Sequence, residues 1–81
     1  MQELIEKVED KFKGVKIYTN HSDKTVETQS FVFWKKDIRY FVRDYYGDTY
    51  SGYTFDELLT NVRIGYHNKI EHRFKLMKIL S

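Results

Sequence analysis

A metal site is suggested only by His67, Glu71 and His72, the one place where ligand-type residues lie close together. On a helix, His67 and Glu71 share a face at a spacing of four residues, whereas His72 lies roughly 100° of rotation from Glu71. A zinc-protease helix needs two histidines at that spacing with the glutamate between them, which this order does not give. Two ligands on one face also leave a zinc site incomplete. We therefore expect no metal site.

The chain contains no motif for covalent or cofactor-dependent catalysis. It has no cysteine, and its serines lie outside any nucleophile-elbow context. Its four glycines are scattered, so they do not form a phosphate-binding loop. Asp44 and Asp48 are expected at strand and turn positions, where aspartate is common. We therefore expect a non-enzymatic protein with no cofactor.

Aromatic and basic residues offer a second kind of chemistry, the stacking of bases and the binding of phosphates. Strand alternation predicts that Phe31, Phe33 and Phe41 share one face of a hairpin, with Arg39 and Arg43 among them. The C-terminal segment adds the basic residues Lys69, Arg73, Lys75 and Lys78. These residues together predict a surface for RNA or DNA.

A tyrosine-rich segment predicts a protein-binding surface instead. Tyr45, Tyr46 and Tyr50 lie around a predicted hairpin turn, and Arg39 and Arg43 lie on the strand that leads to it. Exposed tyrosine, tryptophan and arginine are enriched at the energetic centres of protein interfaces. These five residues are the predicted contacts to a protein partner.

An N-terminal helix is predicted over residues 2–13. Leu4, Ile5, Val8 and Phe12 recur at helical spacing, and Gly14 stands where a helix commonly ends. The helix therefore has one apolar face to place against the rest of the domain.

Three strands are predicted next, over residues 15–20, 25–34 and 38–45, with Lys35–Asp37 as the break between the last two. A fourth short strand follows a two-residue turn at Gly47 and Asp48, which places Tyr45 opposite Tyr50. With this register, the face opposite the phenylalanines carries the following residues: Val32, Trp34, Ile38, Tyr40 and Val42.

A second helix is predicted to begin after Thr54. Thr54 and Glu57 form a capping box, and Tyr53 and Leu58 have the spacing of a hydrophobic staple. We expect this helix to end near Gly65 and a last helix to run over residues 69–80. One continuous helix is the alternative, because the apolar residues keep a single helical phase through Gly65.

The predicted fold is α+β, in the order α-β-β-β-α(-α). A three- or four-stranded antiparallel meander is flanked by the N-terminal helix and by one or two C-terminal helices, as one domain over residues 1–81. Both faces of its central hairpin are apolar, and a chain of this size is not expected to cover both with helices. A pairing of Arg73 with Asp44 is predicted as a means of holding that arginine.

This order is similar in layout to the double-stranded-RNA-binding domain, over most of the chain. That family grips phosphates with a glycine-containing loop and a basic cluster at the start of its second helix. The corresponding stretch here, YSGYTFDELL, carries Asp56 and Glu57, which would repel an anion. The residues and the function of that family are therefore not transferred to this chain.

The composition bears on nucleic-acid binding and on the cellular compartment. Lysine and arginine number 14 against 12 acidic residues, a weaker bias than a dedicated nucleic-acid binder usually has. The absence of cysteine fits a reducing cytoplasm. The charged N-terminus predicts no signal peptide, and the longest apolar run, Phe31–Trp34, is far too short to cross a membrane. We expect a cytoplasmic protein.

These observations predict a non-catalytic binding protein. The chain resembles the small accessory proteins of bacteriophages and mobile elements, among them anti-CRISPR inhibitors of this size and element order. The resemblance implies that it binds and occludes a host protein or a protein–nucleic acid complex. The alternatives are a small RNA- or DNA-binding domain, and a self-associating subunit in which a homodimer covers the second apolar face.

Overall fold

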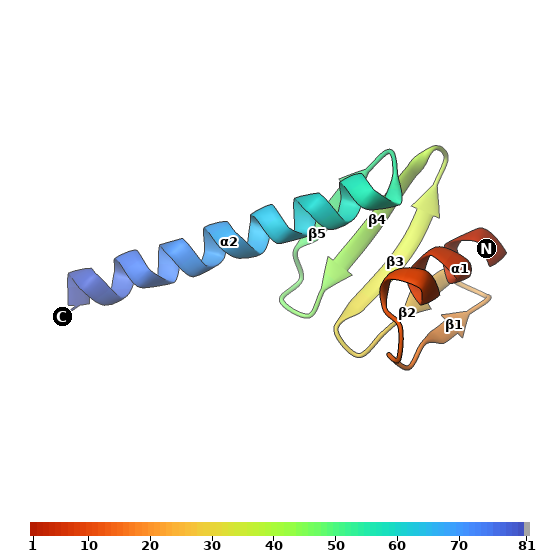
Figure 1. Cartoon of the computed structure of the whole chain (residues 1–81), viewed down its shortest axis with the longest axis horizontal. Helices are drawn as coiled ribbons and strands as arrows, with labels where there is room; N and C mark the ends of the chain where they lie inside the picture. Colours follow the sequence, from red (N-terminus) through yellow and green to blue (C-terminus); the bar gives the residue numbers. More distant parts are fainter. Residues whose placement is uncertain (81) are drawn as a thin grey trace.

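The computed structural model describes the backbone of residues 1–80 and the side chains of residues 1–67. A five-stranded antiparallel meander lies between two helices, and its strands are ordered in space as in the chain (Figure 1). In chain order the elements are α1 (Gln2–Lys11), β1 (Tyr18–Asn20), β2 (Thr25–Glu27), β3 (Phe31–Lys36), β4 (Arg39–Asp44), β5 (Thr49–Gly52) and α2 (Phe55–Leu80). The predicted α+β class and the predicted antiparallel meander are confirmed.

The number of strands differs from the prediction because residues 25–34 do not form one strand. A tight turn divides them: the Thr28 hydroxyl oxygen accepts hydrogen bonds from the backbone N–H groups of Ser30 (3.3 Å) and Phe31 (3.1 Å). The Thr28 N–H also donates to the Phe31 carbonyl at 2.8 Å. Threonine commonly satisfies turn amides in this way. The sheet therefore has five strands instead of three or four.

The β3–β4 hairpin turns on two residues, Asp37 and Ile38, rather than on the predicted three. Lys36 consequently pairs with Arg39, and Trp34 pairs with Phe41. Asp37 takes a positive φ of 56°, a conformation that aspartate tolerates better than most residues. A shift of one residue in register moves every side chain of one strand to the other face.

The predicted faces of this hairpin are therefore wrong. Phe31 and Phe33 point to the same side of the sheet as Val42, whereas Phe41 lies on the opposite side with Trp34. Ile38, predicted to share a face with Trp34 and Val42, lies in the turn and is 71% exposed.

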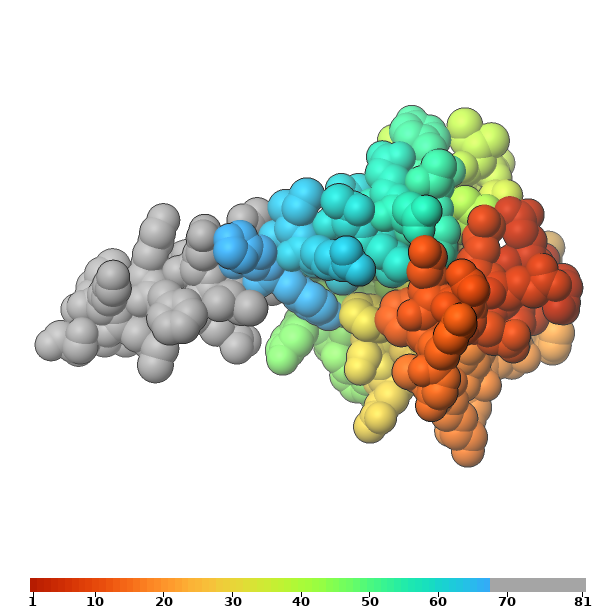
Figure 2. Space-filling model, in the orientation of Figure 1, coloured from red at the N-terminus to blue at the C-terminus, as the bar shows by residue number. Residues whose placement is uncertain are grey.

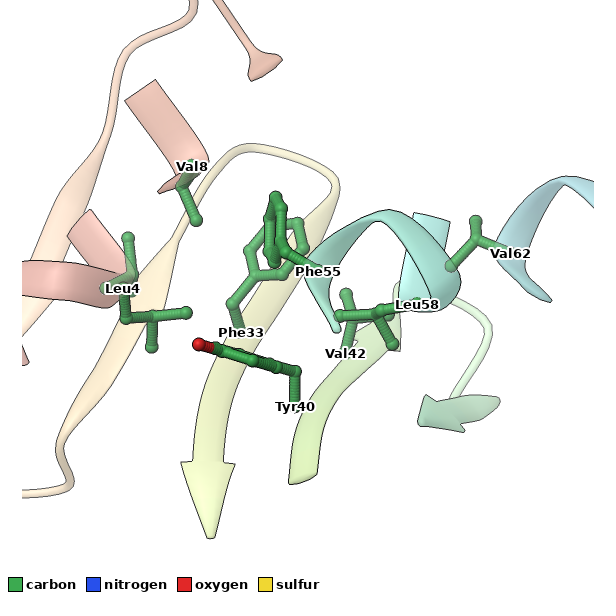
Figure 3. Packing of buried hydrophobic residues seen from close by; sticks show 9 residues of the cluster. Leu4, Val8, Phe33, Tyr40, Val42, Phe55, Leu58 and Val62 are labelled. Carbon is green, nitrogen blue, oxygen red and sulfur yellow. The ribbon is translucent and has the colours of Figure 1, made fainter. Parts of the chain in front are cut away.

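Both helices cover one face of the sheet (Figures 1 and 2). The buried core lies between them and the sheet (Figure 3) and consists of Leu4, Val8, Val26, Phe33, Tyr40, Val42, Phe55, Leu58 and Val62. Phe33 is at its centre, with ring centroids 5.6 Å from those of Phe12 and Phe55. Neighbouring tilted rings of this kind stabilise a small core beyond the area that they bury.

A polar contact ties α1 to the sheet. The Tyr40 hydroxyl donates a hydrogen bond to Glu3 Oε1 at 2.7 Å, and Lys35 Nζ lies 3.9 Å from Glu3 Oε2. The bond from Tyr40, and the charge of Lys35 after it, hold the pKa of the Glu3 carboxyl below its ordinary value. The same bond raises the pKa of Tyr40 to about 12.

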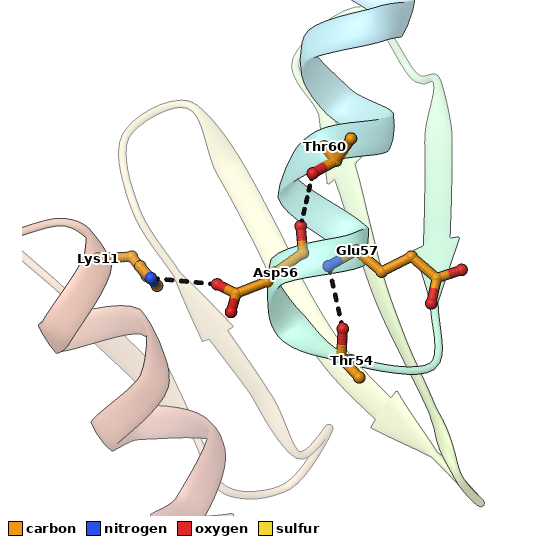
Figure 4. Close-up of polar contacts among 5 residues, drawn as sticks. All are labelled: Lys11, Thr54, Asp56, Glu57 and Thr60. Atoms are coloured by element: carbon orange, nitrogen blue, oxygen red, sulfur yellow. Dashed lines mark hydrogen bonds and ion pairs between the residues drawn. The ribbon is translucent and has the colours of Figure 1, made fainter.

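The predicted N-cap of the second helix is confirmed (Figure 4). Thr54 Oγ1 accepts a hydrogen bond from the Glu57 N–H at 3.1 Å. The return bond differs in one respect, because Glu57 Oε2 accepts from the N–H of Tyr53 (3.3 Å) and not from that of Thr54. The carboxylate of Asp56 in the same first turn lies 3.1 Å from Lys11 Nζ, which links α2 to the end of α1.

The predicted break at Gly65 is wrong, since α2 continues through it to Leu80. Gly65 faces the ring of Tyr50 so closely that a β-carbon there would collide with it. The Tyr66 ring then meets the Tyr50 ring edge-on, with centroids 6.5 Å apart. Gly65 thus permits a close approach between α2 and β5 rather than ending the helix.

Several predicted residues lie outside the described side chains. They are Lys69, Glu71, His72, Arg73, Lys75 and Lys78. The predicted Arg73–Asp44 pair therefore also lies outside the described side chains.

Candidate binding surface

The sheet has a second face, which no helix covers in the described part of the chain (Figure 1). We call it the open face. The strand register assigns to it Tyr18, Asn20, Thr25, Glu27, Val32, Trp34, Lys36, Arg39, Phe41, Arg43, Thr49 and Ser51. Every strand therefore contributes to this surface.

An aromatic pair forms the centre of the open face. Trp34 on β3 lies directly opposite Phe41 on β4, and their rings are parallel within 5°, with centroids 5.5 Å apart. Stacked cross-strand aromatic pairs stabilise a sheet and fix the position of both rings. Both residues are only half-buried, although they are among the largest apolar residues of the chain.

Cations surround this pair. Lys36, Arg39 and Arg43 are exposed. Among the described side chains, ion pairs join Lys11 to Asp56 and Lys35 to Glu3, and none involves these three cations. Glu27 is the one acidic residue that the register assigns to the open face, so three cations and one carboxylate leave an excess of two positive charges.

Arg39 is held in place by Tyr53, which follows β5. Its Nη2 donates a hydrogen bond to the Tyr53 hydroxyl at 3.1 Å, and its guanidinium carbon lies 4.8 Å from the centre of the Tyr53 ring. Tyr53 is 53% exposed. The sequence predicts that its side chain packs against Leu58 as a hydrophobic staple, whereas the structure places it against Arg39. The arrangement fixes a charged group at one end of the open face.

A hollow of about 640 Å³ lies at the other end of the open face. Glu27, Val32 and Arg43 line it from the strands, and Tyr45 and Gly47 line it from the β4–β5 loop. Its lining is about as polar as it is apolar, and its charged residues are one cation, Arg43, and two carboxylates, Glu27 and Asp44.

The β4–β5 loop owes its shape to Asp44, which is only 6% exposed. Its Oδ1 accepts hydrogen bonds from the N–H groups of Tyr46 and Asp48, both at 3.0 Å. Its carbonyl accepts from the Gly47 N–H at 3.2 Å, and Gly47 takes a positive φ of 87°. This is a three-residue loop in which glycine fills the left-handed position, not the predicted two-residue turn at Gly47 and Asp48.

The predicted protein-binding residues are consequently dispersed. Tyr45 and Tyr46 lie at the loop tip, 82% and 73% exposed, and Tyr45 shares the hollow with Arg43. Arg39 lies at the far end of the same face. Tyr50 pairs with Val42 on the helix-covered side and does not face Tyr45.

The predicted nucleic-acid residues are also dispersed. Phe33 is buried in the core, and Phe31 packs at the edge of the core, so of the three phenylalanines only Phe41 belongs to the open face. The predicted register places Trp34 on the face opposite Phe41, whereas the structure places the two side by side. The feature that places Trp34 on the open face is the two-residue length of the Asp37–Ile38 turn, because this length pairs Trp34 with Phe41.

A second, smaller hollow of about 240 Å³ lies between α1 and α2 on the helix-covered side. Phe12, Leu59 and Tyr66 line it, with Arg63 among the lining residues. It is bounded mainly by residues that also pack on the core, and it provides a contrasting surface for experiments on the open face.

The described residues contain no group of three or more histidine, cysteine or acidic side chains that could hold a metal ion. Within the same part of the chain, no helix has both the length and the apolar character required to cross a membrane. Comparison with protein-family models, with curated proteins and with solved structures found no match to this chain. The open face therefore provides the basis for a functional proposal.

Proposed function

We propose that the chain is a non-catalytic binding protein that recognises another protein through the open face. The observation that carries this proposal is the placement of both helices on one side of the sheet. This leaves the Trp34–Phe41 pair facing outward between Arg39 and Arg43.

The residue types of the open face are those that contribute most to protein interfaces. Tryptophan, tyrosine and arginine dominate energetic hot spots, usually as large apolar side chains surrounded by polar ones. Trp34 and Phe41 are already stacked on neighbouring strands, and Arg39 is held by Tyr53. Little side-chain freedom is left to lose on binding, which favours affinity.

A nucleic acid is the second candidate for the same face. Lys36, Arg39 and Arg43, which have no carboxylate partner among the described side chains, favour it. A protein partner is preferred because Trp34 and Phe41 each use one ring face on the other, which leaves less free aromatic surface for bases. The charge excess of the face is also small for a phosphate backbone.

The narrower roles remain predictions. They are that the chain is an accessory or inhibitor protein of phage or mobile-element type, and that it binds and occludes a host protein in the cytoplasm. Self-association through the open face is an alternative that the oligomeric state in solution tests.

Affinity capture with matched variants tests the proposal. Phe41→Thr combined with Arg43→Gln removes an aromatic ring and a charge from the open face, while threonine keeps a high strand preference. Arg63→Gln on the helix-covered side is the control. We expect the wild type and the control to retain the same protein from a lysate of its source. The open-face variant should retain at most about one tenth as much of that protein, with an unchanged far-ultraviolet circular dichroism spectrum.

Equal capture by all three folded chains would contradict the proposal. Loss of the captured material on nuclease treatment, together with a steep fall in binding as salt rises, would assign the open face to nucleic acid instead.

A further inference from the structure

We infer that the protein partner presents an extended acidic segment to the open face, with an apolar side chain between two carboxylates. This inference rests on the proposed function and specifies the chemistry of the partner.

The spacing on β4 carries the inference. Arg39, Phe41 and Arg43 alternate along one strand, so all three point to the open face. At roughly 3.4 Å per residue, the two arginines are about 14 Å apart along the strand, with Phe41 midway. An extended peptide has the same repeat, because its alternate side chains also lie on one side. A segment reading acid, any residue, apolar, any residue, acid therefore matches the three positions.

Charge complementarity selects an acidic segment over a neutral one. No carboxylate among the described side chains pairs with Arg39 or Arg43. Lys36 lies directly opposite Arg39 across the hairpin and adds a second cation at that end. At the other end, Arg43 borders a hollow with room for a second side chain. Two carboxylates line the same hollow: Asp44, whose Oδ1 accepts bonds from two loop amides, and Glu27.

The negative charge of Glu27 repels an acidic partner, so its removal should strengthen binding where removal of an arginine weakens it. Glu27 lies on β2, two strands away from Arg43, with Val32 between them. Two strand spacings correspond to about 10 Å, comparable with the screening length in about 0.1 M salt. Glu27 therefore weakens the attraction of Arg43 for a carboxylate, and removal of its charge should strengthen binding.

The only tryptophan of the chain reports directly on this face. Trp34 emission can be followed while the full chain is titrated with a short synthetic peptide whose centre reads Glu-Thr-Leu-Thr-Glu. A matched peptide replaces both glutamates with glutamine. We expect the acidic peptide to change the emission in a saturable way at low salt, and the glutamine peptide to bind about five- to tenfold more weakly.

Variants assign the effect to residues. Arg39→Gln and Arg43→Gln should each weaken the acidic peptide by about two- to fivefold, and Glu27→Gln should strengthen it by about twofold. Arg63→Gln, on the other side of the sheet, should leave its affinity unchanged.

Three other results would overturn the inference. Equal affinity for the two peptides, or no response up to millimolar peptide while capture still depends on the open face, would overturn the acidic segment and leave the proposed function standing. A salt-dependent response of Trp34 to oligothymidine, without a response to either peptide, would overturn both. Sedimentation showing a dimer that shields Trp34 would assign the face to a second copy and also overturn the inference.

Discussion

At the scale of single residues, the contact between Tyr40 and Glu3 joins a helix to the sheet and makes stability depend on pH. The Tyr40 hydroxyl must stay protonated to donate its hydrogen bond to Glu3. Its pKa is raised from 10.0 to about 12, so the stabilisation is complete below pH 10 and is lost as the pH rises to about 12. The Glu3 pKa is lowered, so its part is present above its ordinary pKa and is lost as the pH falls below that value.

Tyr40→Phe tests this linkage. At neutral pH the variant should unfold at a lower temperature than the wild type. The difference between the two midpoints should narrow as the pH rises from 10 to about 12, because the wild type then loses the bond that the variant lacks. A difference that stays constant over this range in thermal unfolding would show that the hydrogen bond does not contribute.

Gly65 gives a second test at this scale. Alanine normally favours a helix interior over glycine by about 1 kcal/mol. Here a β-carbon would collide with the Tyr50 ring, so Gly65→Ala should lower the free energy of unfolding. In a Tyr50→Ala background the same change should raise it by about 1 kcal/mol. Denaturant unfolding of the four chains measures this coupling, and additive effects would contradict the close approach.

At the scale of elements, the β4–β5 loop depends on one buried carboxylate. Asp44 accepts hydrogen bonds from two loop amides. The net contribution of a hydrogen bond to a charged group is about 1.5–3 kcal/mol, and it is smaller where the amide regains a bond to water once the carboxylate is removed. Asp44→Ala should destabilise the chain by about 2–3 kcal/mol, whereas Asp44→Asn keeps an acceptor oxygen and should cost less. Equal losses for the two variants in denaturant unfolding would mean that the amide bonds are not what Asp44 supplies.

Local signals in the sequence predicted the elements that depend on local chemistry. The apolar spacing of Leu4 and Val8 predicted α1, and Thr54 predicted the start of α2. These features involve residues within a few positions of one another, so a short stretch of sequence contains all of the information.

The features that sequence reasoning missed depend on contacts between distant segments or on a single residue of register. From the sequence, Gly65 indicates a helix end. In the structure it makes room for the Tyr50 ring of β5. A three-residue turn places Trp34 and Phe41 on opposite faces, whereas the two-residue turn of the structure places them on the same face. The candidate surface depends on that count, and no local property of Trp34 reveals it.

At the scale of the whole molecule, two helices on one side of a five-stranded sheet leave the other side uncovered in the part of the chain that the structure describes. The fold places its core, its interhelical ion pair and its helix cap on the covered side. The open face holds a stacked aromatic pair among cations. Changes on this face should therefore affect binding far more than stability, as expected for a surface built for a partner.

Fluorine NMR of Trp34 tests this central claim most directly. Incorporation of fluorotryptophan labels the chain at one position, because it contains a single tryptophan, and leaves an unlabelled partner silent. The captured partner should shift or broaden the Trp34 signal of the wild type and of Arg63→Gln. It should leave the signal of the Phe41→Thr, Arg43→Gln variant unchanged. An unchanged Trp34 signal in a wild-type complex that is shown to be formed would mean that the partner binds elsewhere, and would contradict the open face as the binding surface.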